Sequence, residues 1–364
     1  MPLWQIESLD KLRLENIVKR YDDWVLQLDL HLRNGEIMTL LGPSGCGKTT
    51  TLRIIAGFIH VDRGHIFLDN TIIDDVPPYL RNIGVVFQDY ALFPHLNVFK
   101  NIAFGMRMKK TYTRQQIRQR VAELLALVGL EDYEQRYPDQ LSGGEQQRIA
   151  LLRAIAPHPD ILLLDEPLSA LDFQLRKRLR QEIKNVQRRL GITMLYITHD
   201  QEEALSISDR IAVMRNGHVE QIGTPVEIYQ HPQTKYVAQF VGISNVLSGT
   251  ISQVEQGRFL VQSRPYQFRI PAHKGYARHD DITFFFRPED GYLSIQPQEE
   301  NTIRGKIIAH EYLGAEILTS VESVDHQTYI VSNYIKNEVF IEHEGQEVFI
   351  NFPASACKII EREV

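Results

Sequence analysis

A short glycine-rich run constrains the fold of this chain more than any other feature of its sequence. Residues 42–49 read Gly-Pro-Ser-Gly-Cys-Gly-Lys-Thr, directly after the apolar run Ile37–Leu41 and before a helical stretch that begins near Thr50. Glycines let successive backbone N–H groups turn toward one anion, and the N-terminus of the following helix favours the same anion. A strand, this loop and a helix in that order predict an α/β domain that binds phosphate groups. The candidate phosphate-binding residues are Gly42, Pro43, Ser44, Gly45, Cys46, Gly47, Lys48, Thr49 and Thr50.

The first two thirds of the chain alternate short apolar runs with helical patterns. This alternation predicts a largely parallel sheet flanked by helices, with a domain that spans residues 1–240 and a helical subdomain over about 90–158. Apolar residues at helical spacing predict one helix over 113–130 and another over 173–190, whose basic residues are expected to form a solvated face. The clearest strands are Ile37–Leu41, Ile83–Phe87, Ile161–Leu164, Thr193–Thr198 and Ile211–Met214.

The remaining third of the chain, residues 241–364, has a different texture. Short strand-like segments are broken by Gly, Pro and Asn and show no helical periodicity, which predicts a separate all-β domain built as a small barrel or a pair of barrels. The expected strands are Val246–Val254, Phe259–Gln262, Gln267–Ile270, Ile282–Phe286, Ile303–His310, Ile317–Val324, Thr328–Val331 and Val348–Phe352.

Composition and charge exclude several classes of protein. The chain has 364 residues, a formal net charge of −6 and no long basic run, so we expect no attachment to nucleic acid or to an anionic bilayer. The two cysteines, Cys46 and Cys357, suit a reducing compartment, and charged residues interrupt the N-terminal segment where a secretion signal would need an apolar core. No apolar run approaches the roughly 18 residues of a membrane-spanning helix, so any membrane role is expected to come through partner chains.

Two adjacent carboxylates end one of the predicted strands. Asp165 and Glu166 follow the apolar run Ile161–Leu164. In a phosphate-transfer site, Asp165 and the Thr49 hydroxyl would hold Mg²⁺, and Lys48 would reach the β and γ phosphates of ATP. Glu166 would remain free to orient and deprotonate the attacking water. Acidic residues are also favoured where a strand leads into a helix N-terminus, so this pair alone leaves both interpretations open.

Several further motifs occur in the order that ABC ATPases share. Residues 141–148, Leu-Ser-Gly-Gly-Glu-Gln-Gln-Arg, resemble the signature sequence of that family, between the phosphate loop and the acidic strand. Gln88 resembles the family's glutamine loop, residues 169–172 its D-loop, and His199 its switch histidine. Tyr21 resembles the aromatic residue that stacks on adenine, although an ordinary core tyrosine remains an alternative. Glu145 stands where many members carry Gln, and Leu152 where a small residue is common.

The resemblance implies a P-loop NTPase fold, with a RecA-like core and a helical subdomain, and an ATPase that uses ATP and Mg²⁺. It also implies a homodimer, because Ser142, Gly143 and Gly144 would contact the ATP held by a second subunit. Asp172 is expected to contribute to that nucleotide site, and His199 to contact the γ phosphate and the water. Gln88 would reach the metal and link it to a groove, formed by the apolar segment 88–105, that receives a helix from a membrane subunit; that segment could equally be core.

The C-terminal part resembles a particular group within the family. Residues 286–290 and 311–316 are similar to the oligomer-binding-type (OB-like) barrel that follows the cassette in importer ATPases for maltose, polyamines, ferric iron, sulfate and molybdate. This implies a peripheral subunit at the cytoplasmic face of the inner membrane, with two transmembrane permease subunits and, indirectly, a periplasmic or lipid-anchored substrate-binding protein as partners. We expect the barrel to serve dimer contacts and regulation, although barrels of this type also bind ligands.

Alternative functions differ in what they require of the sequence. A DNA-repair ATPase of this family would need a long coiled-coil insertion between Gly42 and Leu141, and translation-type members usually join two cassettes in one chain. An exporter subunit is harder to separate from the cassette alone, but the β tail favours an importer. Short motifs favour a polyamine slightly over ferric iron as the transported substrate, with sugars and oxyanions behind.

Overall fold

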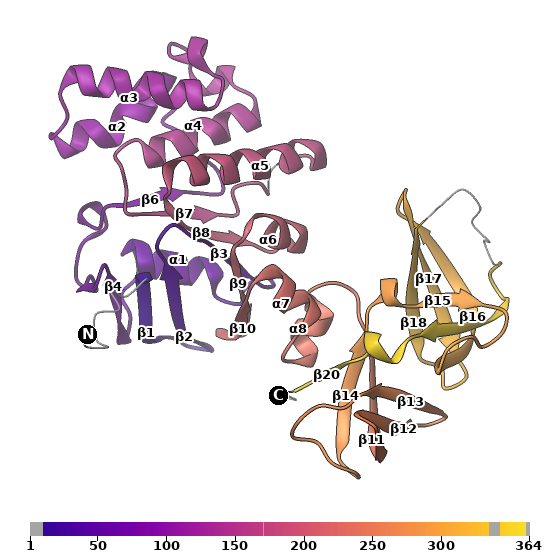
Figure 1. The fold of residues 1–364 in the computed structure, drawn as a ribbon. Coiled ribbons are helices and arrows are strands. Elements are labelled where there is room, and N and C mark those ends of the chain that lie inside the picture. The colour runs from indigo at the N-terminus through magenta and orange to yellow at the C-terminus, as the bar shows by residue number, and fades with distance from the viewer. Residues whose placement is uncertain (1–9, 170, 335–342, 362–364) are drawn as a thin grey trace, which may run out of the picture. The chain divides into compact units, whose positions relative to one another are not determined.

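The computed structural model describes residues 10–169, 171–334 and 343–361, and it divides the chain into two compact units (Figure 1). Unit 1 comprises residues 1–225 and unit 2 comprises residues 226–364. The division falls before the boundary expected between residues 240 and 241, because two short helices pack with the β strands of unit 2. Those helices are α7 (Pro225–Gln230) and α8 (Lys235–Phe240).

Unit 1 is built around a six-stranded sheet whose strand order is β10-β9-β3-β8-β7-β6. All neighbouring strands run parallel except β10, which pairs antiparallel with β9. Strand β8 is buried at every residue, as expected for a parallel strand that is covered on both faces. The strands are β3 (Ile37–Leu41), β6 (Ile83–Val86), β7 (Ile161–Asp165), β8 (Thr193–Thr198), β9 (Arg210–Arg215) and β10 (His218–Gly223).

A second, antiparallel sheet in unit 1 was not predicted. Its strand order is β2-β1-β4-β5, and side chains of β2 alternate between buried and exposed positions along nearly its whole length. The alternation in residues 24–33 was therefore a readable signal for a half-buried strand. The strands are β1 (Asp10–Tyr21), β2 (Trp24–Arg33), β4 (Arg63–Leu68) and β5 (Thr71–Ile72).

The central sheet separates two apolar layers of unit 1. On one face, Leu40 and Ile197 join a core with α1 and the antiparallel sheet. On the other face, Leu164 and Tyr196 join a core with α2 to α5. Alternate side chains of one strand thus enter different cores. The helices are α1 (Lys48–Ala56), α2 (Val98–Lys109), α3 (Arg114–Leu127), α4 (Gly143–Ile155), α5 (Phe173–Leu190) and α6 (Gln201–Ile207).

The two helices predicted from periodicity are confirmed. Helix α3 begins after Thr113, whose hydroxyl accepts a hydrogen bond from Gln116 N in a capping box, and α5 has the predicted bounds. Short 3₁₀ helices complete the connections. They are η1 (Pro78–Leu80), η2 (Glu131–Tyr133), η3 (Pro138–Gln140), η4 (Pro288–Asp290) and η5 (Ala354–Ala356).

Unit 2 consists of two five-stranded antiparallel sheets that share one apolar core. The rings of Phe286 and Phe352 stack in this core with their centroids 4.0 Å apart. The first sheet has the order β13-β12-β11-β14-β20 and the second β15-β19-β16-β17-β18. The strands are β11 (Asn245–Glu255), β12 (Arg258–Ser263), β13 (Tyr266–Pro271), β14 (Asp281–Phe286), β15 (Tyr292–Ser294), β16 (Asn301–Tyr312), β17 (Glu316–Ser323), β18 (Thr328–Tyr334), β19 (Glu347–Phe352) and β20 (Lys358–Ile360).

This architecture confirms the predicted fold class, an α/β cassette followed by an all-β, OB-like region. All eight strands predicted in the β region are present, whereas the short strands β15 and β20 were missed. One buried arginine explains why α7 and α8 belong to unit 2. Arg287 donates hydrogen bonds to the carbonyl oxygens of Tyr229, Ala238 and Ile243, and so fastens both helices to the end of β14.

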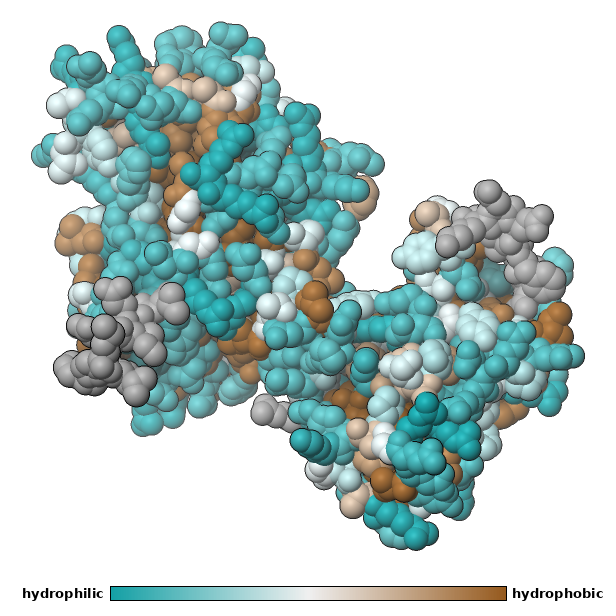
Figure 2. Space-filling view, in the orientation of Figure 1, coloured by the Kyte–Doolittle hydropathy of each residue, from teal (hydrophilic) through white to brown (hydrophobic). Residues whose placement is uncertain are grey.

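The surface of both units is mostly hydrophilic in the view of Figure 2, where hydrophobic side chains form only small patches. Within the described ranges, no helix combines the length and the apolar character that crossing a membrane requires.

Candidate nucleotide-binding site

The glycine-rich loop connects the end of β3 to the start of α1. Gly47 caps the helix with a φ of 110°, a conformation that side-chain-bearing residues rarely adopt. Gly42 is required by close packing, because a Cβ atom there would lie 2.5 Å from the carbonyl oxygen of Met214. Lys48 is buried, and its Nζ donates to the carbonyl oxygens of Gly42 at 2.7 Å and Pro43 at 2.9 Å. The lysine ammonium therefore lies within the curve of its own loop.

The other predicted loop residues follow this geometry. Pro43, Ser44 and Gly45 are exposed at the tip of the loop, whereas Cys46 is buried beneath it. Burial raises the pKa of the Cys46 thiol, so this group is a packing residue rather than a reactive thiolate. Thr50 is half-buried in the first turn of α1. Exposed backbone at the tip and a fixed ammonium behind it suit a phosphate chain.

An oxygen pair suited to a hard metal ion lies beside the loop. The Thr49 hydroxyl donates to Oδ1 of Asp165 at 3.2 Å, across the gap between α1 and the end of β7. Burial raises the pKa of the Asp165 carboxyl, the hydrogen bond from Thr49 opposes this rise, and the charge of Glu166 adds to it. A nearby cation would favour the ionised carboxylate. Hydroxyl and carboxylate oxygens are ligands that Mg²⁺ accepts, with phosphate and water oxygens completing its octahedron.

Glu166 and His199 face each other next to this oxygen pair. Glu166 has a φ of 43°, and its backbone N–H donates to the carbonyl oxygen of Ile197 on β8. His199 follows β8 directly, and its Nδ1 lies 3.1 Å from Oε2 of Glu166. A left-handed conformation at a residue other than glycine costs about 1–3 kcal/mol and is found preferentially at functional sites. The two side chains thus lie in close polar contact at the carboxyl ends of adjacent parallel strands.

Gln88 reaches the same region through a serine of the D-loop. Its Nε2 donates to Oγ of Ser169 at 3.3 Å, and that hydroxyl donates to the carbonyl oxygen of Glu166 at 3.0 Å. Among the described residues, no hydrogen bond joins Gln88 to Thr49 or Asp165. The structure therefore places Gln88 beside the Glu166 segment and leaves its predicted metal contact as a prediction.

The signature residues form a separate cluster with the D-loop. The Ser142 hydroxyl caps α4, and the Glu145 carboxylate accepts from the backbone N–H of Ser142 at 2.7 Å. A Cβ atom on Gly143 would lie 3.2 Å from Leu171, and one on Gly144 would lie 3.1 Å from Leu175. Asp172 caps α5 through Leu175 N, whereas Ala170 lies outside the described residues. No hydrogen bond or ion pair in the described part of the chain connects this cluster to the phosphate loop.

Tyr21 lies at the edge of the site with a second aromatic residue that the sequence analysis missed. Its side chain is 44% exposed at the end of β1, and its ring centroid lies 5.6 Å from that of Trp24. The Trp24 ring in turn packs over Gly47. An exposed aromatic face next to the phosphate loop suits stacking on a base. The proximity of Trp24 to Tyr21 in sequence was the available signal.

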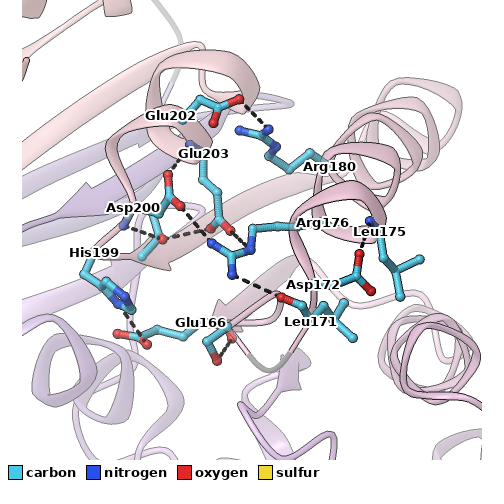
Figure 3. Close-up of polar contacts among 12 residues, drawn as sticks. Glu166, Leu171, Asp172, Leu175, Arg176, Arg180, His199, Asp200, Glu202 and Glu203 are labelled. Atoms are coloured by element: carbon cyan, nitrogen blue, oxygen red, sulfur yellow. Dashed lines mark hydrogen bonds and ion pairs between the residues drawn. The ribbon is translucent and has the colours of Figure 1, made fainter. Parts of the chain in front are cut away.

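Two basic residues of α5 also correct the sequence analysis. The solvated face predicted for this helix is wrong for Arg176 and Arg180, which make ion pairs with the segment after β8 (Figure 3). Arg180 is 6% exposed and pairs with Glu202 at 2.7 Å. Arg176 pairs with Asp200 at 3.0 Å, next to His199.

Phosphate loop, paired carboxylates and switch histidine at one edge of a parallel sheet define an ATP-binding cassette. Residues 25–169 match the family model described as ABC transporter. The chain is 45% identical to a spermidine/putrescine import ATP-binding protein of Clostridium acetobutylicum, over 88% of this chain and 90% of that one. It is 46% identical to the Salmonella typhimurium protein of the same name, over 89% and 87%.

Two solved structures are similar to the cassette. One is cbiO1 from Clostridium perfringens, part of the ABC transporter complex cbiONQ (30% identity, TM-score 0.56, 60% of this chain and 90% of that one). The other is a dimeric ATP-binding cassette in a post-hydrolysis state, bound to ADP and Pi (31% identity, TM-score 0.52, 59% and 98%). The chain belongs to the family of ABC transporter ATP-binding proteins and is an ATPase of that family.

The close approach of Gly42 to β9 generates the first prediction. Gly42→Ala should lower the free energy of unfolding by about 3 kcal/mol, because its Cβ would collide with a backbone oxygen that cannot move cheaply. Gly45→Ala is the control: its φ is positive at 81°, unlike that of Gly42, but no atom lies within 4 Å of the added Cβ, so only about 1 kcal/mol of backbone strain is expected. Denaturant unfolding without nucleotide measures both values. A loss at Gly45 equal to that at Gly42 would contradict the packing argument.

Proposed function

We propose that this chain hydrolyses MgATP as one half of a homodimer, and that the dimer drives import of a polyamine through membrane-spanning partner subunits. The observation that carries the catalytic part is the Glu166–His199 pair, with Nδ1 and Oε2 3.1 Å apart, beside the Thr49–Asp165 oxygens at 3.2 Å. The relatives named for spermidine and putrescine import support the transport part.

Each side chain of the site has a distinct task in hydrolysis. The backbone N–H groups of the loop and the Lys48 ammonium bind the phosphates, and Tyr21 stacks on the base. Thr49 and Asp165 would hold Mg²⁺, which neutralises charge on the phosphates when it is bound. Glu166 accepts a proton from the attacking water through its carboxylate. His199 holds that carboxylate in place and donates a hydrogen bond toward the γ phosphate. Gln88 is connected to the backbone of Glu166 through the hydroxyl of Ser169.

A second copy of the chain completes each nucleotide site. Ser142, Gly143 and Asp172 are exposed. Ser142 and Asp172 cap their own helices, and Gly143 lies against Leu171, whereas within the described residues no hydrogen bond or ion pair joins any of the three to the phosphate loop of its own chain. The N-terminus of α4 presents backbone N–H groups that suit a γ phosphate, and Ser142 and Gly143 at this terminus are exposed. We propose that this cluster covers the ATP bound to the partner chain, in agreement with the dimeric state of a similar solved cassette.

The proposed surface for a membrane subunit includes residues before Gln88, because part of the predicted segment is buried. Tyr90 is buried, and Leu92 and Phe99 pack against the core of unit 1, so part of the segment 88–105 is core. Phe58 is 53% exposed, and its ring lies 6.3 Å from that of Phe87, the residue before Gln88. We propose that the exposed Phe58 ring and the half-buried Phe87 ring help to anchor a helix of a permease subunit at the cytoplasmic face of the membrane.

Unit 2 contains none of the proposed nucleotide ligands. Its barrel-like sheets are fastened to α7 and α8 by Arg287, so it can hold a fixed surface for a partner chain. We propose that unit 2 contributes dimer contacts and regulation. The substrate-binding protein and the permeases recognise the cargo, so no residue of this chain needs to touch it.

Loss of the proposed base provides the test of catalysis. Glu166→Gln should lower kcat by about a hundredfold or more, because the amide keeps the side-chain shape but cannot accept the proton. The dissociation constant for ATP should stay within about threefold, since the phosphate ligands are intact. Steady-state ATPase assays and direct binding measure these values. Glu202→Gln, a change at an exposed carboxylate of α6, is the control and should retain activity. Turnover near the wild-type rate in Glu166→Gln would show that Glu166 is not the base.

Uptake in cells tests the transported substrate. A strain that lacks this gene and other polyamine importers should accumulate labelled putrescine or spermidine only when the wild-type chain is restored. The Glu166→Gln chain should fail to restore uptake, because transport depends on hydrolysis. Ferric iron, the runner-up from the sequence analysis, serves as the comparison substrate. Normal polyamine uptake without the gene, or rescue of iron uptake alone, would rule out a polyamine importer.

A further inference from the structure

Arg176 occupies a central position between two loops of the nucleotide site. It lies in the first turn of α5, and its guanidinium contacts three residues in two segments (Figure 3). Nη2 donates to the carbonyl oxygen of Leu171 in the D-loop at 3.1 Å, and Nη1 donates to Oδ2 of Asp200 at 3.0 Å. Nε lies 3.8 Å from Oε1 of Glu203. Only the planar fork of arginine offers several donors in fixed directions, so a lysine could not reproduce all these contacts.

The segment that Arg176 contacts includes both neighbours of His199. The backbone N–H of Asp200 donates to the Thr198 hydroxyl at 3.0 Å, and the Asp200 carboxylate caps α6 by accepting from Glu203 N. The Thr198 hydroxyl also donates to Glu203 at 2.8 Å. The residues before and after His199 are thus held in one hydrogen-bonded network, to which Arg176 contributes the positive charge.

A buried carboxylate makes this network dependent on that charge. Glu203 is 3% exposed and accepts hydrogen bonds from Tyr196 at 3.0 Å and Thr198 at 2.8 Å. Burial raises the pKa of the Glu203 carboxyl, whereas the positive charge of Arg176 favours its ionised form. Removal of Arg176 would leave Asp200 and Glu203 as neighbouring acids without this cation, so the loop that bears His199 would shift.

We propose that Arg176 is a positioning residue that couples the D-loop to His199. Because Arg176 donates to the carbonyl oxygen of Leu171, its position depends on that of the D-loop. Under the proposed function, the D-loop faces the second subunit. The hydrogen bond of Arg176 to Asp200 and its ion pair with Glu203 hold His199 where Nδ1 lies 3.1 Å from Glu166. The guanidinium of Arg176 therefore connects the D-loop, which would move when the dimer closes, to the alignment of the Glu166–His199 pair. The inference rests on the proposed composite site.

Arg180 provides a matched control for a merely structural role. It lies one turn further along α5, is more buried than Arg176, and joins the same two helices through Glu202 at 2.7 Å and Ser206 at 3.2 Å. Its partners lie on α6, away from Leu171 and from the residues that flank His199. If the only role of these arginines were ion pairing between α5 and α6, removal of either one should have the same effect on kcat.

The experiment compares Arg176→Ala, Arg176→Lys and Arg180→Ala in the full chain. Arg176→Ala should lower kcat by about tenfold or more with an ATP dissociation constant within about twofold, because misplaced catalytic groups slow chemistry without removing phosphate ligands. Arg176→Lys should recover only part of kcat. Arg180→Ala should lower the melting temperature at least as much as Arg176→Ala but keep kcat within about twofold. Should Arg176→Ala fail to fold, Asp200→Asn retains a capping side chain, removes the ion pair, and should lower kcat in the same direction.

A double variant tests whether Arg176 acts through His199. Added to His199→Ala, Arg176→Ala should lower kcat no further, because both changes disable the same group. A kcat for Arg176→Ala within about twofold of wild type, or a full further loss in the double variant, would overturn the inference. Glu166→Gln distinguishes failure of the proposed catalytic function from failure of this inference. If Glu166→Gln retains turnover, the proposed catalytic function is wrong. If Glu166→Gln loses turnover and Arg176→Ala does not, only the proposed role of Arg176 is wrong.

Discussion

The parallel alignment of three neighbouring strands is the constraint on which the rest of the site depends. Strand β8 pairs with β3 on one side and with β7 on the other, with Leu41 opposite Thr198 and Asp165 opposite Ile197. All three strands therefore end at the same edge of the sheet. The phosphate loop, Glu166 and His199 follow these ends directly, although they lie far apart in sequence. Parallel pairing of the backbone thus brings the segments of the site together at one edge of the sheet.

The same arrangement underlies the proposal that one chain holds an incomplete site. The groups at the sheet edge can bind phosphates, a metal ion and a water, but the signature helix α4 is directed against Leu171 and Leu175 at the start of α5. Its exposed N-terminus lacks a hydrogen bond to the phosphate loop within the described ranges. A γ phosphate would be surrounded on all sides only if another copy supplied that terminus. Under the proposed function, the geometry of the site therefore links dimer formation to catalysis.

Local motifs were predictable from sequence, whereas contacts across the fold were not. The glycines of the phosphate loop and the acids Asp165 and Glu166 at the end of β7 are each specified within a few residues, so their spacing indicated them. The roles of Arg176 and Arg180 depend on α6 packing beside α5, and amphipathic periodicity shows only that basic residues avoid the core. Likewise, Arg287 joins α8 to the end of β14, and residues so far apart in sequence form no local pattern. The boundary between the units therefore falls before these helices rather than after residue 240 as expected.

The most direct test of the account is nucleotide occlusion by a mixed dimer. A Lys48→Ala chain lacks a working phosphate loop but keeps its signature, and a Ser142→Arg chain lacks a working signature but keeps its loop. Their heterodimer contains one composite site in which both parts are intact, while neither variant homodimer contains any. The account predicts that the purified heterodimer occludes ATP and that both homodimers fail to do so. Failure of the heterodimer to occlude ATP under conditions where the wild type does would contradict a site shared between two chains.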